Sequence, residues 1–84
     1  MTIVWTKHGG VRQKEWQRKL GITKERVEDV VRNPQQIVPG DLDLLIAQSK
    51  FEGGLLRILY VESGNERRIV TVYWTSKVER YWKE

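Results

Sequence analysis

The sequence has no cysteine, one histidine and two prolines among its 84 residues. Without cysteine there is neither a disulfide framework nor a thiolate metal site, and His8 alone cannot form a histidine cluster for zinc. We therefore expect no metal and no cofactor. Apolar runs such as Leu42–Ala47, which Asp43 interrupts, fall far short of the ~20 residues that a bilayer-spanning helix requires.

Length and charge indicate one small basic domain. At 10.0 kDa, the scaling of folded against unfolded surface predicts that about 64% of the surface is buried on folding, enough for one core. Fifteen Lys and Arg against eleven Asp and Glu give a net charge of +4, too balanced for a disordered tail. We expect a single domain over residues 1–84 and, because no apolar leader is recognisable, a cytoplasmic location.

Hydrophobic periodicity predicts one strand and two helices in the first part of the chain. Thr2–Thr6 is β-branched and aromatic, as is typical of a short, half-buried strand. Val11–Leu20 follows a Gly-Gly pair and has the spacing of a helix with a narrow apolar stripe. A second helix is expected between Thr23, a competent N-cap, and Asn33, which precedes proline.

The remainder of the chain is typical of antiparallel hairpins. Ile37–Val38 predicts a short strand before a Pro-Gly turn, and Leu42–Lys50 fits either a strand or a helix, with the strand favoured because a glycine turn follows directly. Leu55–Val61 and Arg68–Trp74 predict two central strands joined by a Ser-Gly-Asn-Glu turn. Ser76–Glu84 is expected to dock on the sheet as a short helix or a strand extension.

This order predicts an α+β fold, β-α-α-β-β-β(-β), in which two N-terminal helices pack on one face of an antiparallel sheet. Several short motifs accompany it: His8 with Arg12 four residues later, Gly21-Ile22-Thr23, Glu28 and Val31, Asn33-Pro34, Leu56–Tyr60 and Ile69–Tyr73. On these residues the chain resembles the small bacterial domain-of-unknown-function family that is related to the RelE, ParE and BrnT toxins. It departs from the family pattern at Leu20, where family members carry an arginine before the glycine.

The resemblance implies a RelE-like fold. The best-studied proteins with that fold cleave messenger RNA without a metal or inhibit gyrase, and an antitoxin protein keeps them inactive. It therefore implies RNA as a ligand and an antitoxin as a partner. Because a fold does not transfer its function, a non-catalytic module that binds nucleic acid or protein is the alternative.

Candidate catalytic residues follow from the chemistry of RNA cleavage without a metal, which needs a base, cations beside the phosphorane and an acid. Arg57 interrupts an apolar strand and must reach a phosphate, solvent or an acidic partner such as Glu62, Asp43 or Glu28. Arg80 and Tyr81 match in kind the C-terminal residues of RelE-like nucleases. His8, predicted at the end of the first strand, could serve as an acid or a base, but a lone histidine next to Gly-Gly is more often a hydrogen-bonded structural residue.

Candidate nucleic-acid-binding residues are cations outside that group. Regular strand alternation would place Arg68 on the opposite face from Tyr73, so these two are not expected to act together. The charges on the first helix form either a phosphate-binding footprint or an ordinary solvated face. The candidates are Arg12, Lys14 and Arg18 on the first helix, Arg68 on a central strand and Lys77 before the C-terminal piece.

Overall fold

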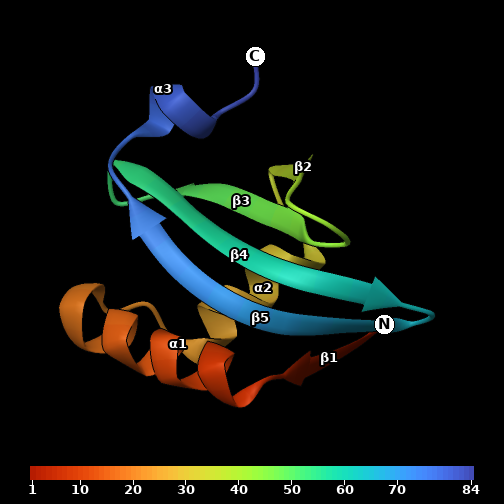
Figure 1. Cartoon of the computed structure of the whole chain (residues 1–84). Coiled ribbons are helices and arrows are strands. Elements are labelled where there is room, and N and C mark those ends of the chain that lie inside the picture. Colours follow the sequence, from red (N-terminus) through yellow and green to blue (C-terminus); the bar gives the residue numbers. More distant parts are fainter.

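The strands of the chain form one five-stranded sheet with the order β1-β5-β4-β3-β2 (Figure 1). The computed structural model describes residues 1–84. Its elements are β1 (Thr2–Trp5), α1 (Lys7–Leu20), α2 (Lys24–Arg32), β2 (Gln36–Pro39), β3 (Leu45–Phe51), β4 (Gly54–Ser63), β5 (Glu66–Thr75) and α3 (Val78–Tyr81). The predicted α+β fold is confirmed.

The sheet is mixed rather than wholly antiparallel. Strands β2 to β5 pair antiparallel through consecutive hairpins, whereas β1 pairs parallel with β5 at the edge. Because β1 and β5 are separated by most of the chain, no hairpin turn forces them to run in opposite directions. None of the helices has the length and apolar character needed to cross a membrane.

The core lies between the sheet and the two N-terminal helices, as predicted. The accessible surface is 5315 Å², close to the roughly 5,200 Å² that the mass predicts for a folded chain. Thr23 caps α2 by accepting a hydrogen bond from the Arg26 amide at 3.1 Å, which confirms the predicted start of this helix. The fully packed cluster contains Ile22, Val27, Val30 and Val31 together with Ala47, Leu56, Ile58, Tyr60, Ile69 and Val72 of the sheet.

Helix α1 begins directly after β1, and this corrects two predictions. The Thr6 hydroxyl accepts a hydrogen bond from the Gly9 amide at 3.0 Å, which caps a helix that starts at Lys7 rather than Val11. The Gly-Gly pair is therefore helical, and His8 lies exposed in the first turn of α1 instead of at the end of the strand.

The edge of β5 that extends beyond β1 is covered by α1. The Thr6 hydroxyl donates to the Ile69 carbonyl at 2.9 Å, and the Trp16 indole donates to the Val72 carbonyl at 3.1 Å. The Ile69 carbonyl also accepts the Thr6 backbone amide at 3.1 Å, whereas Val72 lies beyond the residues that pair with β1. These contacts draw α1 so close to β5 that a Cβ at Gly9 would lie 2.8 Å from the Ile69 carbonyl oxygen.

The ambiguous segment Leu42–Lys50 is a strand from Leu45 onward, as favoured. Leu42 lies outside it, 99% exposed, in a turn where its φ is 56°. The following hairpin turns through Glu52 and Gly53, both with positive φ, the conformation of a type I′ turn.

A β-bulge at Val70 corrects the predicted faces of β5. Leu59 pairs with Thr71 but Tyr60 pairs with Ile69, so Val70 is the extra residue. The extra residue reverses the alternation, and Arg68 consequently lies on the same face of the sheet as Tyr73.

The contact of α1 with β5 predicts opposite effects for the same substitution at adjacent glycines. Gly9→Ala should lower the free energy of unfolding by about 1–2 kcal/mol, because the new methyl group clashes with the Ile69 carbonyl. Gly10→Ala, which meets no atom within 4 Å, should raise it by about 0.5–1 kcal/mol through helix propensity. Urea denaturation measures both, and equal effects would contradict this packing.

The Tyr60 hydroxyl, fully buried, has no hydrogen-bond partner, and burial raises the pKa of this phenol above 10.0. Tyr60→Phe should therefore raise the free energy of unfolding by about 1 kcal/mol at neutral pH. The gain should grow above pH 10.0, where the wild-type chain loses stability because its unfolded form releases this proton first. Urea titrations at neutral pH and at about pH 11 test both points. A less stable Phe variant would instead indicate a bound water on the hydroxyl.

Candidate nucleic-acid interface

A row of four polar side chains crosses the face of the sheet opposite α1 and α2. Gln36 pairs with Gln48, Gln48 with Arg57, and Arg57 with Tyr73, so one residue comes from each of β2, β3, β4 and β5. Residues paired across neighbouring strands project on the same face, which places these side chains next to one another. We call these four residues the polar row.

Hydrogen bonds connect the polar row from end to end. Arg57 Nε donates to Gln48 Oε1 at 2.9 Å, and Arg57 Nη1 donates to the Tyr73 hydroxyl. Gln48 Nε2 in turn donates to Gln36 Oε1 at 2.8 Å. Because a guanidinium can only donate, it fixes which end of the Gln48 amide faces it, and this orients the Gln36 amide as well.

Arg57 carries a buried charge with no counter-charge. The residue is 6% exposed, and none of the four salt bridges of the chain includes it. The salt bridge considered from the sequence is therefore absent: Glu62 pairs with Arg67 at 3.0 Å instead. Arg57 Nη2 has no acceptor in the chain. It is nevertheless not among the buried side-chain nitrogen and oxygen atoms that lack a hydrogen-bond partner, because the Tyr60 hydroxyl is the only such atom. Nη2 must therefore keep contact with solvent.

Residues 78–84, here called the C-terminal segment, lie over the polar row on the side of the sheet away from α1 (Figure 1). The Arg57 guanidinium lies 4.1 Å from the centre of the Tyr81 ring, a cation–π distance. The Tyr81 carbonyl accepts a hydrogen bond from Gln48 Nε2 at 3.0 Å. The prediction that the C-terminus docks on the sheet as a short helix or a strand extension is confirmed as helix α3.

The end of the C-terminal segment is bound through its backbone. The Lys83 amide donates to Gln36 Oε1 at 3.1 Å, while Gln36 Nε2 donates to the Lys83 carbonyl. One side-chain amide thus binds both backbone polar groups of one residue, Lys83. Next to it, the Lys50 ammonium lies 4.4 Å from the centre of the Trp82 ring.

The structure brings together three of the four predicted catalytic residues. Arg57 and Tyr81 are in contact, and the exposed Arg80 guanidinium lies 5.6 Å from the centre of the same Tyr81 ring. Tyr73 joins them from β5. His8 does not, because α1 packs against the helix-covered face and the β5 edge.

The predicted nucleic-acid-binding residues are scattered. Lys14 and Arg18 are exposed on α1, and Arg12 of the same helix pairs with Glu15 at 3.0 Å. Lys77 is exposed and immediately precedes α3. Arg68 lies on the same face as Arg57. However, Arg68 pairs with Val61, which is four residues after Arg57 on β4, so the two arginines are separated by about 13 Å along the strand.

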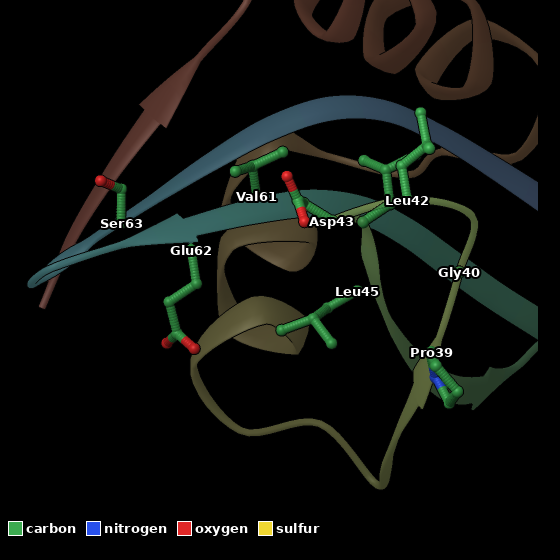
Figure 2. Close-up of a pocket in the computed structure, with 9 residues that line it drawn as sticks. Pro39, Gly40, Leu42, Asp43, Leu45, Val61, Glu62 and Ser63 are labelled. Carbon is green, nitrogen blue, oxygen red and sulfur yellow. The ribbon is translucent and has the colours of Figure 1, made fainter.

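The largest hollow on the surface lies elsewhere and has the wrong charge for phosphate. It is an open pocket of about 560 Å³ between the loop that follows β2 and the end of β4 (Figure 2). Asp43 and Glu62 contribute carboxylates to it, and Leu42 and Leu45 contribute apolar surface. Carboxylates repel a phosphate, so this pocket is not the candidate interface.

Sequence reasoning missed Gln36 and Gln48. Gln48 interrupts the apolar part of β3 and is fully buried, and a buried amide requires partners. The two-residue turn at Glu52 and Gly53 fixes Gln48 opposite Arg57. The pairing of Gln48 with Arg57, which follows from the length of this turn, was therefore the signal that could have identified Gln48 as a site residue.

No protein-family model, curated protein or solved structure matches the chain. The RelE-like resemblance consequently stays a prediction from the sequence, and the geometry of the polar row carries the functional argument.

The polar row predicts a strong coupling between Gln48 and Arg57. Gln48→Leu should lower the free energy of unfolding by about 2–3 kcal/mol, because it leaves the Arg57 Nε–H buried without an acceptor. Adding Arg57→Met should recover much of that loss, since both polar partners are then replaced by apolar groups. Urea denaturation of both single variants and the double variant measures the coupling. Strictly additive effects would contradict it.

Proposed function

We propose that this chain is an RNA-binding protein of the RelE-like, toxin-related type and that RNA phosphate binds at the polar row beside Arg57. The observation that carries the proposal is the buried, uncompensated guanidinium: Arg57 has only neutral partners, the Gln48 amide and the Tyr73 hydroxyl. Burying an unpaired charge is costly, and an anionic ligand removes that cost. A guanidinium also presents the donor geometry that phosphate oxygens accept.

The surroundings of Arg57 suit RNA better than a free anion. Tyr73 and Tyr81 place aromatic rings within 5.6 Å and 4.1 Å of the guanidinium, and unstacked bases of single-stranded RNA stack on such rings. Arg80 is exposed beside the Tyr81 ring and adds a second positive charge. Phosphate and base can thus be contacted at the same place.

Cleavage of the bound RNA without a metal is a second candidate function, supported by the convergence of Arg57, Tyr73 and Tyr81. In that reaction the ribose 2′-oxygen attacks phosphorus, the bond to the 5′-oxygen breaks, and a proton passes from the 2′-hydroxyl to the leaving oxygen. Arg57 would stabilise the charged phosphorane, and tyrosine hydroxyls are the nearest groups for the proton transfers. The distance of His8 from this group supports the non-catalytic alternative. An antitoxin partner is proposed on the resemblance.

Arg57→Met should lower both RNA affinity and stability. RNA affinity should fall at least about tenfold, because a phosphate contact is lost, and the free energy of unfolding should fall by about 1–3 kcal/mol, because the buried Gln48 oxygen loses its donor. Arg18→Met on α1 removes the same charge at an exposed site and should change affinity much less. Fluorescence anisotropy with single-stranded RNA at fixed salt measures both. An equal loss in the two variants would contradict a specific interface at Arg57 and indicate a general charge effect.

Incubation of messenger RNA with the purified protein in EDTA decides between the enzyme and the binding module. Discrete fragments that disappear in Arg80→Ala and Tyr81→Phe would assign cleavage to the C-terminal residues. Intact RNA that nevertheless binds would establish the non-catalytic module. RNA that neither binds nor breaks would reject the proposed function.

A further inference from the structure

The C-terminal segment uses the same atoms of the polar row that a bound RNA would have to reach. Its Tyr81 ring covers the Arg57 guanidinium, and the Tyr81 carbonyl occupies the outward donor of Gln48. The backbone of Lys83 occupies both polar ends of the Gln36 amide. The segment therefore competes directly with any ligand of Arg57.

The attachment of this segment is polar and shallow. Helix α3 has one turn, no buried residue and no side-chain N-cap. Arg80, Lys83 and Glu84 are exposed, and Tyr81 and Trp82 are only half-buried. Segments that bury little apolar surface open at a lower free energy than the packed core, so this one can leave the sheet while the fold persists.

We propose that the C-terminal segment is an autoinhibitory cover: it closes the polar row in the free protein and must lift from Arg57 before RNA binds, after which Tyr81 and Arg80 contact the bound RNA instead of the polar row. The ligand in this proposal rests on the proposed function, whereas the closure is a property of the chain alone. The apparent affinity for RNA is then the intrinsic affinity reduced by the fraction of molecules in which the segment is open.

Lys83→Pro tests the cover without touching any side chain of the polar row. Proline has no amide hydrogen, so this variant loses the hydrogen bond from Lys83 to Gln36 Oε1. Trp82 already has φ −73° and ψ 132°, a conformation that a residue before proline tolerates. Lys83→Ala is the matched control, because it removes the same charge and keeps the amide hydrogen.

If the segment is a cover, Lys83→Pro should bind single-stranded RNA about fivefold more tightly than Lys83→Ala, the change expected for one hydrogen bond in the closed state. Trp82→Ala, which loses the contact with Lys50, should act in the same direction. Equal or weaker binding by both variants, with wild-type folding, would overturn the proposal.

Chemical modification of Arg57 measures closure without RNA. Phenylglyoxal reacts with accessible arginines, and peptide mass spectrometry gives the rate at Arg57 relative to the exposed Arg18. This relative rate should be higher in Lys83→Pro than in Lys83→Ala. Equal rates would overturn the proposal that the segment covers Arg57, regardless of the RNA-binding result. Faster modification with unchanged RNA affinity would show that the segment opens but does not inhibit. Faster modification without RNA binding by any variant would reject the proposed function and leave the closure standing.

Discussion

The burial of one guanidinium determines how the whole outer face of this protein is arranged. Arg57 can only donate hydrogen bonds, so the Gln48 oxygen must face it, the Gln48 nitrogen must face outward, and Gln36 must follow. The backbone of the C-terminal segment then binds to amides that are already oriented. A charge in the middle of β4 thus fixes the position of residues about 25 positions later, through amides that carry no charge themselves.

The two faces of the sheet divide structural and functional roles. The helix-covered face holds the apolar cluster that includes Tyr60 and Val31, and it supplies the burial that a chain of this size requires. The opposite face keeps a charged and hydrogen-bonded row at its centre, which an apolar packing would replace at no loss of stability. Buried charges that an apolar core would not need are typical of functional sites.

Local signals in the sequence were enough to predict which segments form helices and strands. Predicting the polar row also required knowing how the strands pair. Thr23 marks the start of α2 by its own chemistry, whereas the cap at Thr6 was hidden because a Gly-Gly pair in the first turn resembles a break. An unbroken register from the Ser63–Glu66 pair would place Val72 opposite Arg57, and only the bulge at Val70 brings Tyr73 there. The polar row is therefore a product of strand pairing, which no single segment encodes.

The interior position of the long strands limits the addition of strands from other chains to this sheet. Strands β4 and β5, with ten residues each, lie inside it, and α1 covers the part of β5 that β1 does not reach. The two bare edges, β1 and β2, have four residues each, and β2 ends in a proline that cannot donate a hydrogen bond. Short edges of this kind are poor templates for strand addition, so the protein is protected against edge-to-edge aggregation in spite of its strongly β-forming sequence.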